Sequence, residues 1–139
     1  MQVRDKLDAT ERAARQLGDA CFAAWDALIN GSGAVASRNA HAVMDASYVA
    51  STTARLIAHA DQYQLHMIAM QIAVCRRVAS RCATICKDHP DPTVNACARV
   101  ARAAVASCND VLRLLWDGAL AAAAADDIED EGSGETSVA

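Results

Sequence analysis

The stretch CATICKDHPDPTVNAC, residues 82–97, decides the fold that we expect from this sequence. Pro90 and Pro92 lie at its centre, and proline disrupts a helix interior but suits a first helical turn. We therefore expect one helix to end before Pro90 and the next to begin near Pro92. The cysteines on either side leave three interpretations open: a soft-metal site, half of a disulfide, or a helix end whose core residues are cysteine.

Working outward from this turn, the rest of the chain has the pattern of long helices. Glycines cluster at Gly31 and Gly33, and no alternation of β-branched residues is present. Apolar spacing near 3.6 residues predicts helices between these breaks, with a weak break near Asp61 and Gln62. The expected helices cover about 3–30, 35–60, 63–88 and 92–125. Four helices with short connections predict an all-α fold, an antiparallel four-helix bundle.

Composition and charge divide the chain into two parts. Of its 139 residues, 53% are hydrophobic but only 4% aromatic, so alanine supplies much of the apolar content. Residues 126–139 carry six of the 17 acidic residues and no base, which leaves 11 acidic and 13 basic groups in the body. We expect a bundle over 1–125 and an acidic disordered tail over 126–139. The near-neutral body predicts no nucleic-acid partner.

The sequence also predicts a cytoplasmic protein with no membrane partner. No apolar run reaches the roughly 18 residues of a membrane span. The start, MQVRDKLDATERAARQ, lacks the apolar core of a signal peptide. In a reducing compartment, six cysteines are expected as free thiols or metal ligands rather than as a disulfide framework.

Helical spacing places every cysteine on an inward-facing ladder, defined here as positions that follow steps of three and four residues. Residues at these steps share one face of a helix. The three ladders are Ala14, Leu17, Cys21, Ala24 and Leu28; Ile72, Cys75, Ala79, Cys82 and Cys86; and Val94, Cys97, Ala101, Ala104 and Cys108. Each ladder position is small, apolar or a thiol, so we expect these faces to form the core.

This pattern resembles the cytosolic copper storage proteins, four-helix bundles lined inside with cysteines at these steps. In that family the last cysteine of the third helix is followed by a short turn rich in His and Asp, and then by the first cysteine of the fourth helix. Here Cys86, the turn KDHPDPT with His89, and Cys97 follow that order. The segment VASTTARLI, residues 49–57, is similar to the family's second helix. The resemblance covers roughly residues 10–115 and implies that the chain binds copper ions.

The chain departs from the family at most ladder positions, where apolar residues replace cysteine. On the second helix, Ala46 and Ala50 stand at cysteine positions of the family. Each Cu(I) ion takes about two or three soft ligands, so six thiols do not support storage of many ions. We therefore expect a small number of Cu(I) ions bound through inward-facing thiols.

The turn near residue 90 predicts which thiols face each other. Because the flanking helices are antiparallel, facing residues have numbers that sum to about 180–184. This pairing predicts a three-thiol site of Cys82, Cys86 and Cys97, and a two-thiol site of Cys75 and Cys108. His89 lies in the turn, within reach of the Cys86 end, and completes the predicted metal ligands. Cys21 is expected to lie alone, near the level of Ala79.

Other interpretations stay open at this point. Buried cysteine packs as a small hydrophobe, so the thiols also suit an inert core. Zinc is disfavoured because no CxxC pair meets a second pair or a His pair. An alanine-lined interior can leave a cavity, so the main rival is a repurposed bundle that binds a small molecule or acts as an enzyme. Enzymatic chemistry has little support, since no phosphate loop, Ser/His/Asp set or Glu-x-x-His pair is present.

The stretch HMIAM, residues 66–70, falls on the flank of its helix or opposite the thiol face. Exposed methionine-containing patches often mark partner surfaces. We therefore expect a homo-oligomer, and this stretch is either part of the contact or an entry site at one end of the bundle.

Overall fold

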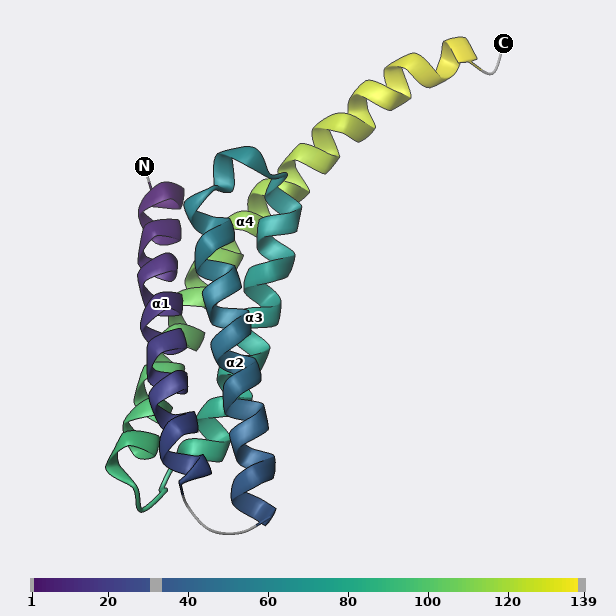
Figure 1. The fold of residues 1–139 in the computed structure, drawn as a ribbon. Coiled ribbons are helices and arrows are strands. Elements are labelled where there is room, and N and C mark those ends of the chain that lie inside the picture. The colour runs from purple at the N-terminus through teal and green to yellow at the C-terminus, as the bar shows by residue number, and fades with distance from the viewer. Residues whose placement is uncertain (1, 31–33, 138–139) are drawn as a thin grey trace.

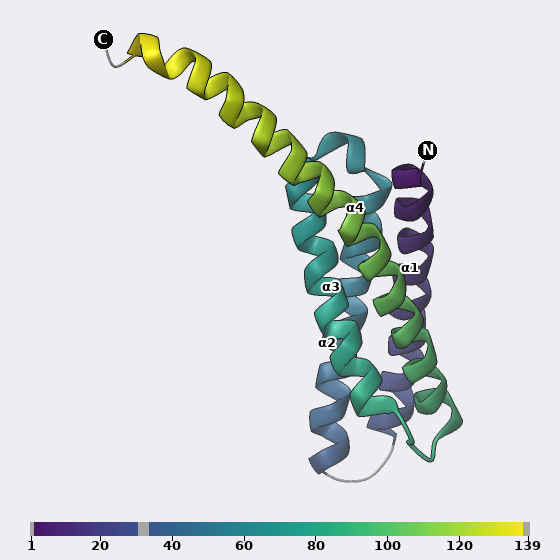
Figure 2. The same cartoon turned by 180° about the vertical axis from the view of Figure 1, so that it is seen from behind.

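The computed structural model describes the backbone of residues 2–30 and 34–137 and the side chains of residues 3–30 and 38–117. Its four long helices are α1 (Gln2–Ile29), α2 (Ala34–Ala58), α3 (Leu65–Cys86) and α4 (Pro92–Ser137), and the short 3-10 helix η1 (Ala60–Gln62) joins α2 to α3. The long helices lie side by side in alternating directions (Figure 1, Figure 2). The predicted antiparallel four-helix bundle is therefore confirmed.

The turn between α3 and α4 is built by local hydrogen bonds. The Asp91 carboxylate accepts the backbone amides of Thr93 at 2.8 Å and Val94 at 3.3 Å, which caps the start of α4. Pro92 occupies the first helical position, where its missing N–H costs no hydrogen bond. Asp88 adopts a φ of 58°, in the left-handed region that Asp tolerates better than most residues. The predicted turn is therefore present and brings the two cysteine-bearing helices side by side.

A polar side-chain contact crosses each interface between neighbouring helices. The contacts are Ser47 Oγ to Gly18 O at 2.9 Å (α2–α1), Thr10 Oγ1 to Ser107 Oγ at 3.0 Å (α1–α4), Arg76 Nη1 to Asn109 Oδ1 at 3.1 Å (α3–α4), and Gln71 Nε2 to Thr53 Oγ1 at 2.9 Å (α3–α2). At Gly18 a Cβ atom would lie 2.8 Å from the Ser51 hydroxyl, so glycine permits the close approach of α1 and α2. These contacts fix how the helices are placed along one another.

The core consists of small apolar side chains and thiols. Every position of the three predicted ladders is buried, and all six cysteines are free thiols. The α2 helix adds a fourth inward ladder, whose members are Val43, Ala46, Ala50, Thr53 and Ile57, each fully buried. The interior is therefore narrow, and its cysteines point toward one another rather than toward solvent.

The end of α4 differs from our expectation. We predicted an end near residue 125, whereas the helix continues to Ser137 and leaves the bundle (Figure 1). The side chains of the acidic tail, residues 126–139, lie outside the described residues, so the division into bundle and disordered tail stays a prediction. Within the described part of the chain, no helix combines the length and apolar character that crossing a membrane requires.

Candidate metal centre

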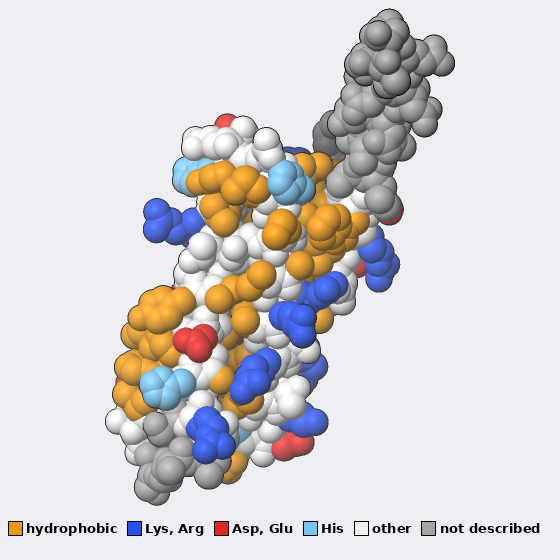
Figure 3. All heavy atoms as spheres, turned by 90° about the vertical axis from the view of Figure 1, so that its right-hand side faces the viewer, with side chains coloured by type: hydrophobic (Ala, Val, Ile, Leu, Met, Phe, Trp, Pro, Cys, Tyr) orange, Lys and Arg blue, Asp and Glu red, His pale blue; other side chains and the backbone are white. Residues whose placement is uncertain are grey.

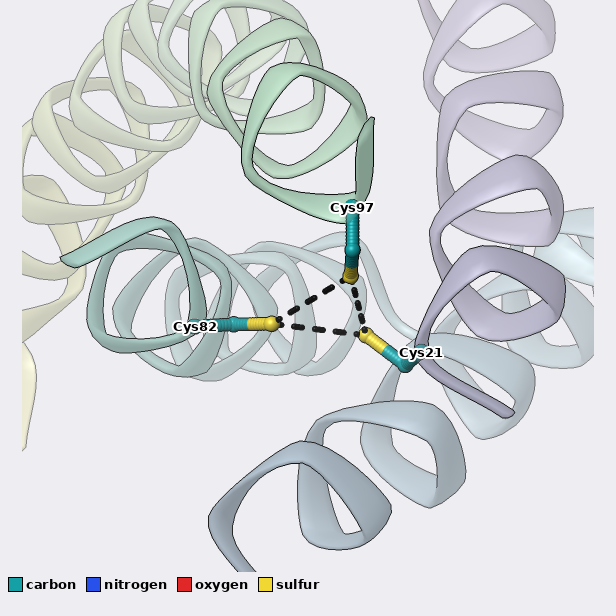
Figure 4. A group of neighbouring side chains, drawn as sticks. All are labelled: Cys21, Cys82 and Cys97. Carbon is teal, nitrogen blue, oxygen red and sulfur yellow. Dashed lines mark hydrogen bonds between the residues drawn. The ribbon is translucent and has the colours of Figure 1, made fainter. Parts of the chain in front are cut away.

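Four buried thiols meet inside the bundle, close to the α3–α4 turn. Cys82 Sγ lies 3.5 Å from Cys21 Sγ, 3.7 Å from Cys97 Sγ and 3.9 Å from Cys86 Sγ. The Sγ atoms of Cys21 and Cys97 are 3.7 Å apart. Figure 4 shows that Cys21, Cys82 and Cys97 point from three different helices toward a common centre. We call Cys21, Cys82, Cys86 and Cys97 the four-thiol cluster.

Cys21 belongs to this cluster, and our prediction that it lies alone is wrong. Sequence numbering placed it level with Ala79, whereas the structure places it level with Cys82. The difference is three residues of helix, or about 4.5 Å. Two connections separate α1 from α3, and the shift that each introduces along the bundle cannot be obtained from residue spacing.

Three of the sulfurs have the spacing of ligands around one metal ion. The Sγ atoms of Cys21, Cys82 and Cys97 all lie within 4.8 Å of one another. A triangle with their separations has its centre about 2.1 Å from each sulfur, near the roughly 2.3 Å of a metal–thiolate bond. A small outward movement of the side chains would therefore suffice to accommodate a three-coordinate ion.

The cluster stabilises one thiolate among neutral thiols. Hydrogen bonds with Cys21, Cys82 and Cys86 hold the pKa of Cys97 well below its ordinary value. Contacts with Cys21, Cys86 and Cys97, together with burial, raise the pKa of Cys82. The contact with Cys82 lowers the pKa of Cys86, but Cys97 and burial outweigh it and raise that pKa to about 12. The first proton is therefore lost from Cys97, and the remaining thiols act as hydrogen-bond donors to it.

The second group of thiols is the pair Cys75 and Cys108, in the same interior between α3 and α4. A hydrogen bond with Cys108 lowers the pKa of Cys75, desolvation opposes this effect, and a hydrogen bond with Thr53 supports it. Contact with Cys75 and burial raise the pKa of Cys108, whereas the charge of Arg76 lowers it. The two cysteines face each other, as the position of the turn predicted.

His89 lies in the α3–α4 turn, outside the four-thiol cluster. Its Nδ1 atom accepts the backbone amide of Asp91 at 3.0 Å, and its own amide donates to the Cys86 carbonyl at 3.4 Å. The imidazole is half-buried. Nδ1 is thus engaged in shaping the turn, which leaves Nε2 as the atom for any metal contact, and the predicted ligand role stays a prediction.

The cavities of the structure do not favour the rival small-molecule site. Five surface cavities among the described residues have no ladder alanine in their lining. One of them, of about 400 Å³, opens at the surface between Lys6 on α1 and Arg113 on α4. The ladder alanines are themselves buried in the core, so none of these five cavities is an alanine-lined ligand site.

Comparison with known proteins agrees with the fold and the site. The sequence profile of the copper storage protein family matches residues 3–113. A mutant of Streptomyces lividans Ccsp has a similar structure, with a TM-score of 0.74 and 22% identity over 81% of this chain and 96% of that chain. A cytosolic copper storage protein from Streptomyces lividans, described as loaded with five coppers, gives a TM-score of 0.74 and 21% identity over 80% of this chain and 95% of that chain.

No curated protein matches the sequence. At these identities the two solved structures show that the fold is shared. The family profile spans most of the chain, including all six cysteines, and confirms the resemblance inferred from the sequence. The chain therefore belongs to the copper storage protein family.

Proposed function

We propose that this chain binds a small number of Cu(I) ions in the cytoplasm, through the four-thiol cluster and the Cys75–Cys108 pair. The observation that carries this proposal is the triangle of sulfurs from Cys21, Cys82 and Cys97, which converge at ligand spacing from three helices. Thiolate ligands select soft ions such as Cu(I). Family membership supports the same ion.

The number of converging sulfurs favours Cu(I) over Zn²⁺. Cu(I) takes about two or three soft ligands, and Cys21, Cys82 and Cys97 supply three at ligand spacing. Zn²⁺ in a structural site takes four ligands in a tetrahedron, and the Sγ atom of Cys86 lies outside this group of three, 3.9 Å from Cys82 Sγ. The cluster therefore favours Cu(I) although it contains four thiols.

Capacity should be low, because the structure provides two groups of thiols rather than a continuous thiol lining. The cluster and the pair are separated along α3 by Ala79, which is fully buried and offers no ligand. We expect about two to four Cu(I) ions per chain.

The decisive experiment is a competition titration of the reduced apo-protein with Cu(I) and a chromophoric chelator, without oxygen. About two to four equivalents should be withheld from the chelator, and equimolar Zn²⁺ should leave that number unchanged. Retention of no Cu(I), or displacement of Cu(I) by Zn²⁺, would contradict the proposal.

His89 remains a candidate ligand at the end of the cluster. It follows Cys86 by three residues, and its Nε2 is available for a metal contact while Nδ1 holds the turn. His89→Ala should slow Cu(I) uptake and leave the final stoichiometry unchanged, as measured by stopped-flow loading. A change in stoichiometry instead would make His89 a retained ligand, and no change in either quantity would remove it from the ligand set.

We also propose that the chain self-associates through an apolar stripe on α3. Met67, Met70 and Val74 follow helical spacing and are 50%, 59% and 48% exposed. Figure 3 shows hydrophobic side chains toward both ends of this face of the bundle, and a row of Lys and Arg side chains along it. Sedimentation velocity should show an assembly that Met70→Lys dissociates and Thr84→Lys, an exposed control on the same helix, does not. A monomeric wild-type chain would contradict this assignment.

A further inference from the structure

The α2 helix contributes no thiol to either group, but it does contribute a buried hydroxyl. Its inward ladder consists of Val43, Ala46, Ala50, Thr53 and Ile57. Thr53 is the polar member of this ladder and is fully buried. Thr53 lies near enough to Cys75 that a hydrogen bond between them would lower the pKa of that thiol.

A relay of hydrogen bonds holds the Thr53 hydroxyl in place. It donates to the Val49 carbonyl at 2.7 Å and accepts from Gln71 Nε2 at 2.9 Å. Gln71 precedes Cys75 by four residues, or one turn of α3, so the two side chains are neighbours on one helix face. The amide of Gln71 thus ties the Thr53 hydroxyl to α3, one turn before Cys75.

We infer that Thr53 positions and stabilises Cys75 for Cu(I), by donating its hydroxyl hydrogen to the Cys75 sulfur when the Cys75–Cys108 pair is loaded. The inference rests on the proposed function. Loading replaces the thiol protons with the ion, and the protons leave to solvent. The hydroxyl hydrogen then rotates about its C–O bond, from the Val49 carbonyl to the sulfur.

The rotation leaves no polar group without a partner. The Val49 carbonyl keeps the backbone N–H that it accepts within α2, because helical carbonyls bond to the amide four residues on. The hydroxyl oxygen still accepts from Gln71. The new bond is the stronger one, because its acceptor carries charge.

The pair has a particular need for such a donor. Two thiolates and one Cu(I) ion carry a net charge of −1 in a buried site, where charge requires compensation. The positive charge of Arg76 favours the Cys108 thiolate, and the Thr53 hydroxyl lies near Cys75. Hydrogen bonds from outer residues to metal ligands typically change metal affinity about 10- to 100-fold. The Thr53 hydroxyl therefore stabilises the Cys75–Cys108 pair from α2, a helix that supplies no sulfur ligand.

The test compares variants of two buried threonines. Thr53→Val removes the hydroxyl and keeps the shape of the side chain, whereas Thr53→Ser keeps the hydroxyl and removes the methyl group. Thr10→Val is the matched control, because Thr10 is also fully buried, donates to the carbonyl four residues earlier at 2.8 Å, and contacts a polar residue on a neighbouring helix. Each full-length protein carries ¹³C-labelled cysteine Cβ atoms, is loaded with Cu(I), and is titrated with a competing chelator while the cysteine signals are recorded by NMR.

Thr53→Val should lose Cu(I) from Cys75 and Cys108 at about tenfold less chelator, with the cluster signals unchanged. Thr53→Ser should behave as the wild type, and so should Thr10→Val. Equal retention in Thr53→Val and wild type, or equal losses in Thr53→Val and Thr10→Val, would overturn the role of Thr53 and leave copper binding standing. A wild-type chain whose Cys75 and Cys108 signals never respond to Cu(I) would instead overturn the proposed function at this pair, and the inference with it.

Discussion

The four-thiol cluster and the Cys75–Cys108 pair lie in one core but compensate charge by different means. In the cluster, hydrogen bonds with the other three thiols lower the pKa of Cys97. In the pair, the contact with Cys108 is the main cause that lowers the pKa of Cys75, and Thr53 and Arg76 add support from outside the sulfur set. The difference indicates that a site with few thiols also draws on its polar neighbours, whereas a denser group of thiols compensates its own charge.

The largest expected effect comes from removing the central sulfur of the cluster. Cys82 lies within 3.9 Å of the other three cluster sulfurs, so Cys82→Ala should lower Cu(I) affinity of the cluster at least about 100-fold and leave the pair loaded. Alanine already fills neighbouring ladder positions, so the fold should persist. Cys108→Ala is the reciprocal control and should empty the pair alone. Chelator competition with cysteine NMR measures both, and loss of copper from both groups in either variant would show that they form one site.

Acidification should weaken the two groups by different amounts. A thiol loses its proton when it binds the ion. In the cluster the pKa of Cys97 is lowered but those of Cys21 and Cys82 are raised, so a three-coordinate ion displaces about two protons. In the pair the pKa of Cys75 is lowered and that of Cys108 is raised, so an ion displaces about one proton. Affinity falls about tenfold per pH unit for each proton released, so the cluster should weaken more steeply than the pair as the pH falls from 8 to 6. Competition titrations across this range measure the two slopes, and equal slopes would contradict the prediction.

The sequence was sufficient to predict the fold and the pairing across one turn, but not relations between distant helices. Pro90, Pro92 and the capping residue Asp91 determine where α3 and α4 meet, so the facing of Cys75 and Cys108 follows from residue numbers. The level of Cys21 depends on two further connections and was wrongly predicted. The reason is physical, because axial shifts between helices are set by packing and not by spacing within a helix.

Two further features were not predicted. Thr53 continues the steps from Ala46 and Ala50, so extending the α2 ladder to polar residues would have found it. We expected α4 to end near residue 125, because residues 126–139 are acidic. The alanines in residues 119–125 have strong helix propensity and favour a longer helix. In both cases the local sequence indicated the observed structure, and the error was to assume that polar residues lie in solvent or outside a helix.

Placing a thiol between the four-thiol cluster and the Cys75–Cys108 pair should have a smaller effect on Cu(I) binding. Ala79 is fully buried and lies on the same ladder between Cys75 and Cys82. Ala79→Cys should raise capacity by about one Cu(I) ion, because the new sulfur is within one turn of thiols on both sides. Ala106→Cys, at an exposed position of α4, is the control and should add no tightly held ion. Mass spectrometry of the loaded proteins under native conditions counts the ions, and an unchanged count in Ala79→Cys would show that the interior has no room between the two groups.

The smallest expected effect concerns the charge beside the pair. Arg76 is partly buried, donates to Asn109 at 3.1 Å, and favours the Cys108 thiolate through its charge. Arg76→Gln retains a donor and removes the charge, so it should weaken Cu(I) binding at the pair about threefold and leave the cluster unaffected, because water screens a partly exposed charge. Arg77→Gln is the adjacent control, since Arg77 is exposed. The effect of Arg76→Gln should shrink in high salt, whereas that of Thr53→Val should not, because a buried hydrogen bond is not screened. If salt changed the effects of Thr53→Val and Arg76→Gln equally, the two residues would not act by a buried hydrogen bond and a screened charge, respectively. The pair and the cluster would then differ only in their number of thiols.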